Sequence, residues 1–444
     1  MRISTVSVFS HSEFTFSWLE FKDFFLHNKR NMKNKKNQPK LLSSKIKKTL
    51  IGVLAVIAAA SLTVIVIKNL PSREVTIAFY HIDEQERKEI NEVITQIAQN
   101  HKIAFKSIEY KSDAPLSKQP LRPKADIIFT TSGYSLESAI EEAPKNALLL
   151  EDIPQGMTSS MRSAIRTTDG KIAALPFLSS HLELNIELSE FKSSNIGAIN
   201  TWNDVEKFLR AQKRQKDYPV ALAGGDADFF LDFLGAMAES IDGVDSYNSA
   251  VKILKETSNP VKAATKLCDE PDSPLATSVK QLKSWYKLGF LHPGTFSFQK
   301  NDVEAFASSR LSSVLALSLE NHRKFAQKTI SRFSTIYFPS ALPANSRIFT
   351  GKIYYAVPQT KSEKAKALLN FLVTESAQED LCRATGLAPV LAQCRTPDKQ
   401  SYEARYWIAA TASPLAGLSN EVYISKEKKA TIAAEIASRI KNKD

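Results

Sequence analysis

Glycine and cysteine are both scarce in this chain of 444 residues, which contains 14 glycines and three cysteines. So few cysteines exclude a disulfide-rich scaffold, and an odd number leaves at least one thiol outside any internal disulfide. Only Cys382 and Cys394 lie near each other in the sequence. The seven histidines are scattered and there is no Cys-x-x-Cys pair. We therefore expect neither a metal site nor a cofactor.

The sequence also lacks two signatures of hydrolases. It has no Gly-x-Ser-x-Gly turn to hold a nucleophilic serine and no His-Glu-x-x-His pair to bind zinc. Asp226 and Asp228 lie too close in the sequence to establish a catalytic carboxylate pair. We expect the protein not to be an enzyme.

Positive charge is concentrated near the N-terminus. The formal net charge is +12, and nine Lys or Arg residues fall within residues 29–48, which contain no acidic residue and leave +3 for the rest. This segment has no interleaved aromatic residues, so it is a poor candidate for binding nucleic acid. Anionic lipid head groups are its expected partners.

An uncharged apolar run follows the basic segment. Residues 49–67 number nineteen, which is long enough to cross a hydrocarbon core of ~30 Å as a helix. The lysine excess keeps residues 1–48 in the cytoplasm, so the main domain is expected outside the inner membrane, in the periplasm. We expect residues 49–70 to be a single-pass transmembrane anchor or uncleaved signal. Cleavage after Ala58-Ala59-Ala60 is the alternative, and residues 1–31 are either a cytoplasmic segment or a mis-assigned start.

Strand and helix patterns alternate beyond residue 73, which is typical of an α/β fold. Residues 75–79 predict a buried strand, residues 84–100 an amphipathic helix, and residues 103–108 a second strand. This order implies a parallel pair joined by a right-handed crossover. In open parallel sheets ligands collect at the carboxyl ends of the strands. That rule places three segments at the edge of a cleft: residues 80–81, 130–133 and 179–181.

The stretch from residue 172 to residue 202 carries the most information. An apolar strand pattern runs into Leu175-Pro176-Phe177, then Leu184-Asn185, and then Thr201-Trp202 at a helix start. Pro176 has no N–H to donate, so we expect it at the edge or end of a strand. Thr201 is the expected N-cap of the helix, and Asp204 in its first turn suits the helix dipole. Further motifs flank this stretch in a fixed order: residues 124–129, 282–293, 303–317, 351–373 and 386–390.

In this order the motifs resemble those of the bacterial extracellular solute-binding proteins of family 1, the sugar-binding type that serves ABC importers. The resemblance covers about residues 74–392. It implies a two-lobed periplasmic-binding-protein fold, type II-like, with hinge crossovers between the lobes. The expected first lobe is residues 73–178 plus 347–390, and the second is residues 179–346 plus 391–444.

The same resemblance implies the function. The expected protein captures a carbohydrate or similar polar solute between its lobes and delivers it to the permease subunits of the transporter. The alternative is a membrane-anchored sensor or scaffold of the same fold with a degenerate ligand cleft. Residues 316–322 lack the glycine that relatives commonly have there, so close backbone approach to a ligand is lost. This absence favours the alternative, whereas the crossover motifs favour transport.

Strand ends, turns and the resemblance together give the candidate ligand-binding residues. Several of them compete with a role as helix N-cap, namely Thr131, Ser132, Asp226 and Asp228. Trp202 and Trp285 are expected in the core, whereas Trp407 is expected to stack on a sugar, as aromatic residues of that region do in relatives. The candidates are Tyr80, His81, Thr131, Ser132, Ser179, His181, Asp226, Asp228, Phe229, Thr350, Lys352 and Trp407.

Overall fold

The computed structural model describes residues 74–119, 122–143, 156–157, 172–343, 347–396, 399, 402–403 and 414–442. The chain divides into two compact units, Met1–Ser72 and Arg73–Asp444, and all described residues belong to the second. Within these residues no helix has the length and apolar character needed to cross a membrane. The predicted anchor, residues 49–70, lies outside the described part of the chain.

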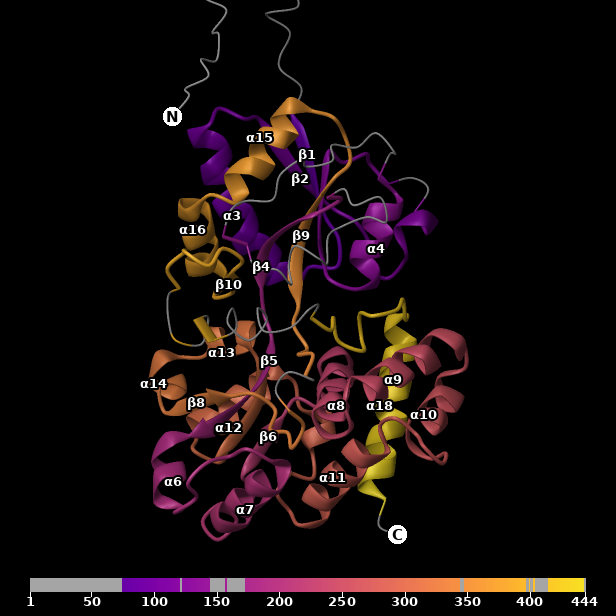
Figure 1. The fold of residues 1–444 in the computed structure, drawn as a ribbon, viewed down its shortest axis with the longest axis vertical. Coiled ribbons are helices and arrows are strands. Elements are labelled where there is room, and N and C mark those ends of the chain that lie inside the picture. Colours follow the sequence, from indigo (N-terminus) through magenta and orange to yellow (C-terminus); the bar gives the residue numbers. More distant parts are fainter. Residues whose placement is uncertain are drawn as a thin grey trace, which may run out of the picture. The chain divides into compact units, whose positions relative to one another are not determined.

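Two β-sheets, each with its own hydrophobic core, organise the second unit (Figure 1). The strand order is β10-β4-β9-β3-β1-β2 in the six-stranded sheet and β6-β7-β5-β8 in the four-stranded sheet. We call the six-stranded sheet with its helices the first lobe, and the four-stranded sheet with its helices the second lobe. The predicted α/β class is confirmed, while the predicted lobe boundaries stay a prediction.

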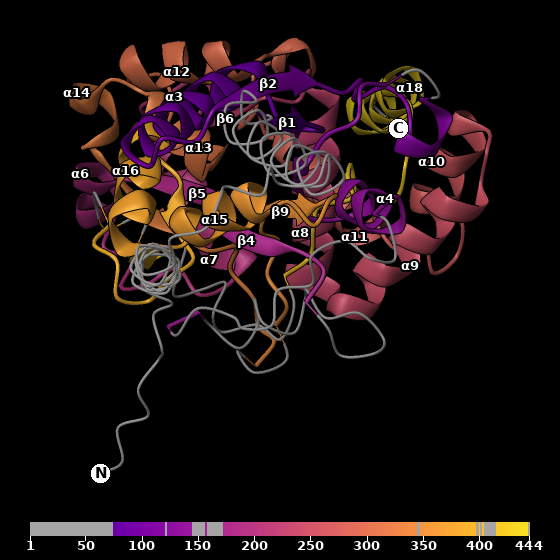
Figure 2. The same cartoon turned by 90° about the horizontal axis from the view of Figure 1, so that it is seen from above.

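The first lobe contains β1 (Val75–Phe79), α3 (Glu84–Asn100), β2 (Phe105–Glu109), η2 (Leu116–Lys118), β3 (Ile127–Thr131), α4 (Tyr134–Glu141), β4 (Leu175–Ser179), β9 (Ile353–Pro358), α15 (Glu363–Leu372), α16 (Glu375–Thr385) and β10 (Ala388–Pro389). Helices α3 and α16 pack together, as Figure 2 shows.

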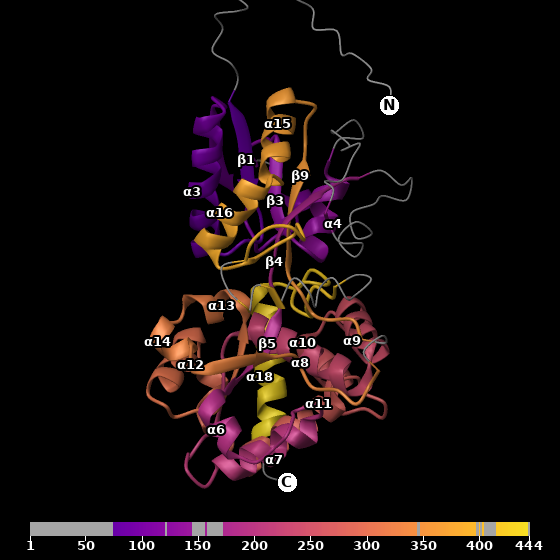
Figure 3. The same ribbon diagram turned by 60° about the vertical axis from the view of Figure 1, so that its left-hand side comes forward.

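The second lobe contains β5 (Leu182–Glu187), α6 (Leu188–Ser193), α7 (Trp202–Gln212), β6 (Val220–Leu222), α8 (Ala227–Asp242), α9 (Val244–Glu256), α10 (Pro260–Cys268), α11 (Ala276–Lys287), η3 (Thr295–Ser297), α12 (Lys300–Ser308), β7 (Val314–Ser318), α13 (Leu319–Lys324), α14 (Gln327–Ile330), β8 (Phe333–Ile336) and α18 (Lys426–Lys441). The C-terminal helix α18 packs against α8, α10 and α11 (Figure 3).

The start of the first lobe follows the predicted pattern. Strand β1 and helix α3 have the predicted bounds, and β1 pairs in parallel with both β2 and β3. Strand β2 begins at Phe105 rather than Ile103, because the Ile103 N–H closes the end of α3 by donating to the Ala98 carbonyl at 2.8 Å. The carboxyl ends of β1, β2 and β3 therefore meet at one edge of the sheet, where a ligand site is expected.

Pro176 lies near the end of a strand, as predicted, but at its start, because β4 begins at Leu175 and continues to Ser179. The short β10 pairs only with Leu178 and Ser179, so Pro176 pairs with β9 alone. The pairing register with β9 shifts between Pro176 and Leu178. A proline without an N–H is tolerated inside a sheet where such a bulge interrupts the ladder.

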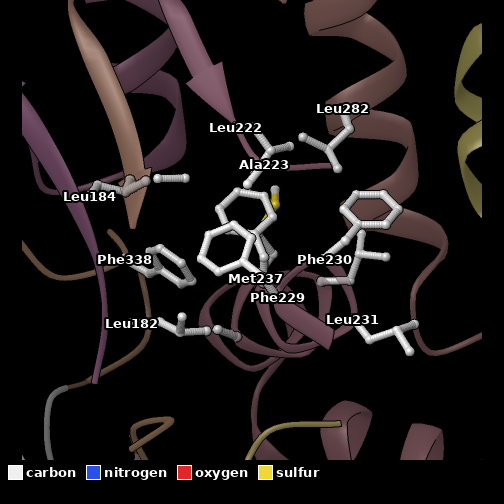
Figure 4. Close-up of a cluster of buried hydrophobic side chains, with 14 of the residues drawn as sticks. Leu182, Leu184, Leu222, Ala223, Phe229, Phe230, Leu231, Met237, Leu282 and Phe338 are labelled. Atoms are coloured by element: carbon white, nitrogen blue, oxygen red, sulfur yellow. The ribbon is translucent and has the colours of Figure 1, made fainter. Parts of the chain in front are cut away.

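The core of the second lobe is built around α8. Figure 4 shows Phe229, Phe230, Leu231 and Met237 of this helix among side chains from other elements of the lobe. The predicted core positions of Trp202 and Trp285 are confirmed, since both side chains belong to this buried cluster. Helix α7 begins with a capping box in which Thr201 accepts from the Asp204 N–H, as predicted for this N-cap.

Candidate ligand-binding site

A cavity of about 330 Å³ lies where the two lobes meet. One wall comes from the segments after β1, β2 and β3, and the opposite wall comes from α8, α12, α13 and the C-terminal segment. The two connections β4–β5 and β8–β9 contribute Ser180, His181, Thr350 and Lys352 to its sides. Its volume is at the low end of the ~300–1,000 Å³ typical of small-molecule sites, so a small solute would fit.

Eight of the predicted site residues line this cavity: His81, Thr131, His181, Asp226, Asp228, Phe229, Thr350 and Lys352. Three others do not line the cavity, and their hydroxyl groups form hydrogen bonds within the first lobe. The Tyr80 hydroxyl donates to the Ala114 carbonyl at 3.3 Å, and the Ser179 hydroxyl donates to the Ala388 carbonyl at 3.4 Å. The Ser132 hydroxyl accepts from the Ile353 N–H at 3.2 Å. Trp407 lies outside the described residues.

The competing capping roles are resolved differently for each residue. Asp226 caps α8, with its carboxylate accepting from the Phe229 N–H at 3.1 Å, and it also lines the cavity. Helix α4 begins after Gly133 without a side-chain cap, so neither Thr131 nor Ser132 has that role.

His81 is the second residue after β1 and has a positive φ of 61°, which turns the chain at the sheet edge. Burial lowers the pKa of His81 to about 3, and the charges of Lys429 and Lys352 add to this effect. The imidazole is therefore neutral at pH 7 and has one donor and one acceptor nitrogen.

The other predicted histidine, His181, is held by the second lobe. Its Nε2 lies 3.1 Å from Glu183 Oε2, and both side chains are fully buried. Glu183 also contacts His322 Nδ1 and accepts from Asn185 Nδ2 at 3.0 Å. Burial acts to raise the pKa of Glu183, but the two histidines outweigh it and hold that pKa at about 2. His181 thus forms a fixed wall of the cavity beside the first lobe-to-lobe connection.

Lys352 enters the cavity from the second connection and is surrounded by carboxylates. Its Nζ lies 3.9 Å from Glu86 Oε2, a buried carboxylate that also accepts from the Tyr354 hydroxyl at 2.6 Å. Burial acts to lower the pKa of Lys352, but Glu86, Asp83 and further carboxylates outweigh it and raise that pKa. Lys352 is therefore a permanent cation at neutral pH.

The sequence reasoning missed several residues of the second-lobe wall. Glu320, 6% exposed, lines the cavity at the start of α13 and accepts from the Ser180 hydroxyl. It falls in the segment where relatives commonly have glycine, so the departure at residues 316–322 was a signal for a side chain at the site. Asp232 lies about one turn after Asp228 on α8, a spacing that places both on one helix face.

The C-terminal residues of the site had no comparable signal. Residues 414–424, which we call the C-terminal strap, belong to the second-lobe core through Leu418 and Ile424. The strap also contacts the first lobe: the Asn420 carbonyl accepts from the Tyr134 N–H at 2.8 Å, and the Tyr423 hydroxyl donates to the Asp113 carbonyl at 2.6 Å. It therefore connects the lobes directly along one side of the cavity.

Asp232 is expected to give the protein a distinct pH dependence. Burial, helped by the charge of Asp228, raises the pKa of Asp232 to about 7. The unfolded chain releases this proton near pH 4, so the ionised carboxylate costs stability that increases from about pH 4 to about pH 7 and is constant above. The substitution Asp232→Asn removes that cost, and its amide still offers an acceptor to the Ser419 N–H, 2.7 Å from Oδ1.

We expect Asp232→Asn to have little effect on stability at pH 4 and to stabilise the protein by about 2 kcal/mol at pH 8. The full difference between the pKa values of Asp232 in the folded and the unfolded protein corresponds to ~4 kcal/mol of stability. Because Asp232 is partly exposed, we expect a smaller effect. Urea unfolding of both proteins between pH 4 and pH 8 measures the difference, with Asp380→Asn on the exposed face of α16 as the control. A difference that does not change with pH would contradict the assignment.

Comparison with known proteins agrees with this geometry. A model of the bacterial extracellular solute-binding protein family matches residues 117–406, more than half of the chain. The chain belongs to this family. No curated protein sequence gave a significant match.

Solved structures of solute-binding proteins share the fold at low sequence identity. The binding protein MsmE of Bacillus subtilis, in an open conformation, has a TM-score of 0.63 and 14% identity, with 84% of this chain and 94% of that chain covered. A sugar transporter of Bacillus licheniformis in complex with stachyose has a TM-score of 0.56 and 11% identity, covering 82% and 98%. The binding protein RafE in complex with raffinose has a TM-score of 0.61 and 13% identity, covering 82% and 98%. At these identities the likeness supports the fold alone.

Proposed function

We propose that this solute-binding protein is the receptor component of an ABC importer, which encloses a carbohydrate or similar polar solute and delivers it to a membrane permease. The observation that carries the proposal is the cavity shared by both lobes and both connections. A ligand that contacts all four parts stabilises one relative position of the lobes, and this is how hinged binders report that they are loaded.

The remaining parts of the proposal come from the sequence. Residues 49–70 anchor the chain in the inner membrane, and the lobes lie on the extracytoplasmic side. The chain binds its solute without chemical change, while ATP turnover belongs to partner subunits. The structurally similar proteins in complex with stachyose or raffinose support a sugar as the solute.

Thermal unfolding of the full-length chain in detergent tests this function. A panel of neutral and amino sugars, oligosaccharides, amino acids and polyamines is added in excess. A ligand present at 100 times its Kd is expected to add about 2.7 kcal/mol to the free energy of unfolding, seen as a rise of a few degrees in Tm. No shift with any member, for a well-folded preparation, would favour the sensor or scaffold with a degenerate cleft.

Two substitutions of carboxylate residues test whether a ligand that raises Tm binds in this cavity. Glu320→Ala removes a buried side chain from the cavity, whereas Asp380→Ala removes an exposed one from α16. We expect the ligand-induced rise in Tm to shrink in the first variant and to be unchanged in the second. An equal shift in both variants would place the ligand outside this cavity.

A further inference from the structure

The lysines of the cavity are already balanced by carboxylates. Lys429 Nζ lies 2.6 Å from Asp228 Oδ1, and Lys300 Nζ lies 3.5 Å from Asp226 Oδ2. Lys352 is paired with Glu86, as described above. A fourth lining lysine, Lys426, is exposed at the start of α18. Three of these lysines therefore form ion pairs and the fourth is exposed to solvent. None of them lacks a partner that an anionic solute would supply.

Four further carboxylates line the cavity without a direct ion pair, although the charge of Lys352 acts on Asp83, Asp232 and Glu320. Asp83, Asp113, Asp232 and Glu320 have no Lys, Arg or His nitrogen within 4.0 Å among the described residues. Glu320 is bonded to a serine hydroxyl, and Asp232 accepts from the Ser419 N–H and from the Ser419 hydroxyl at 3.1 Å. These neutral donors bring no positive charge, and a bound cation would favour the ionised form of Asp232, whose pKa burial raises to about 7. The six lining carboxylates exceed the four lining lysines by two.

Unsatisfied neutral acceptors accompany this negative charge. Asn420, 5% exposed, lines the cavity and uses its side-chain NH₂ group on Thr131 Oγ1 at 3.2 Å and on the Ser132 carbonyl. Its Oδ1 has no hydrogen-bond partner in the described structure, and neither has the hydroxyl of Thr350, 8% exposed. Buried polar atoms are rarely left unpaired. The Asn420 oxygen can only accept and so indicates a ligand that donates a hydrogen bond, whereas the Thr350 hydroxyl can donate or accept.

Aromatic stacking contributes little at this site. Phe229 is the one Phe, Tyr or Trp among the described lining residues, and it is 7% exposed with its ring stacked on Phe233 at 6.2 Å. The broad aromatic faces that suit the apolar face of a neutral sugar ring are therefore not presented by this part of the wall. Recognition must depend on hydrogen bonds and charge.

We propose that the solute carries a protonated amine, as in an amino sugar, and that Asp232 and Glu320 bind this group. An ammonium donates three hydrogen bonds and accepts none, which matches carboxylates and the lone acceptor of Asn420. Hydroxyl groups of the solute then bind Thr350 and the two remaining carboxylates, Asp83 and Asp113. This inference rests on the proposed function, because it names the solute class for the same cavity.

Isothermal titration of the full-length chain in detergent at pH 7 tests the amine with matched sugars. Glucosamine and galactosamine are each compared with the N-acetylated derivative and with the parent hexose, and spermidine represents an amine without a ring. We expect an amine to bind at least ~10-fold more tightly than its neutral counterparts, which corresponds to ~1.4 kcal/mol. Tighter binding of spermidine than of amino sugars supports the amine and assigns it to a polyamine.

Neutral sugars that bind as tightly as the amines would overturn this inference and leave the proposed function intact. If no member of this panel binds, the inference fails, while the proposed function is decided by the wider panel of the thermal unfolding experiment. The amine affinity is also expected to fall severalfold between 0.05 and 0.5 M salt, while a neutral sugar is little affected, because salt screens ion pairs.

Charge-neutralising variants assign the binding group. Glu320→Gln and Asp232→Asn are expected to weaken the amine ~10- to 100-fold and to change the affinity of an N-acetylated analogue less than ~3-fold. Two variants are used so that poor folding of one does not remove the test. Asp380→Asn, on α16 outside the cavity, should change neither affinity. Equal losses for amine and neutral analogue would overturn the assignment of these carboxylates.

Discussion

The substitution Arg347→Met is expected to lower the free energy of unfolding by about 3–5 kcal/mol. Arg347 lies in the second lobe-to-lobe connection, and its guanidinium binds Glu239 of α8 through Nε at 2.7 Å and Nη2 at 2.8 Å. The Arg347 and Glu239 side chains are only 7% and 2% exposed. Removing the arginine leaves a buried carboxylate without its counterion, which costs much more than the loss of an exposed ion pair.

A double substitution separates this cause from loss of packing. Arg347→Met combined with Glu239→Leu removes both charges, so much of the lost stability should return. Arg210→Met is the matched surface control, because Arg210 pairs with Glu206 at 2.5 Å while 55% of its side chain is exposed. We expect that variant to lose less than ~1 kcal/mol in urea unfolding. A loss for Arg347→Met no larger than for Arg210→Met would contradict the structural account.

The same ion pair also affects the site. Glu239 Oε1 accepts from the Ile348 N–H at 3.2 Å, two residues before the cavity residue Thr350. Farther along this connection, the Gly351 N–H donates to the Leu415 carbonyl of the strap at 2.8 Å. Arg347 therefore fixes the path of the second connection relative to α8, and we expect Arg347→Met to weaken ligand binding as well.

Local patterns were sufficient to predict the start of the first lobe. Strand β1 is a short, almost continuous apolar run that is buried throughout, and helix α3 has buried apolar residues at a period of about 3.6. Strand β4 was harder to predict. A proline normally ends a strand, and only the partner β9, far along the chain, provides the bulge that tolerates Pro176 inside the sheet.

The site was predictable where it depends on strand ends. His81 and Thr131 come directly from the rule that ligands collect at the carboxyl ends of parallel strands. The opposite wall was not predictable in that way. Asn420 reaches the cavity by packing against Thr131, 289 residues earlier in the chain, and no local pattern reports such a contact. Phe229, a predicted ligand-binding residue, lines the cavity but belongs mainly to the buried cluster around α8.

Gly133→Ala is expected to lower the free energy of unfolding by about 2–4 kcal/mol. Gly133 has a φ of +92°, which is strained for any residue with a side chain, and an added Cβ would lie 2.1 Å from the backbone oxygen of Asn420. That oxygen accepts from the Tyr134 N–H, so the strap must move away from the first lobe and this hydrogen bond must lengthen or break.

Because Asn420 lines the cavity, the same movement should also weaken solute binding, which separates Gly133→Ala from a substitution that affects stability alone. Gly197→Ala is the matched control, since nothing lies within 4 Å of its added Cβ, and it should leave both stability and affinity nearly unchanged. Urea unfolding and titration with the solute measure the two effects on each variant. A Gly133→Ala protein with the stability of Gly197→Ala would show that the strap does not lie against this turn in solution, and the cavity would then lack the wall that Asn420 provides.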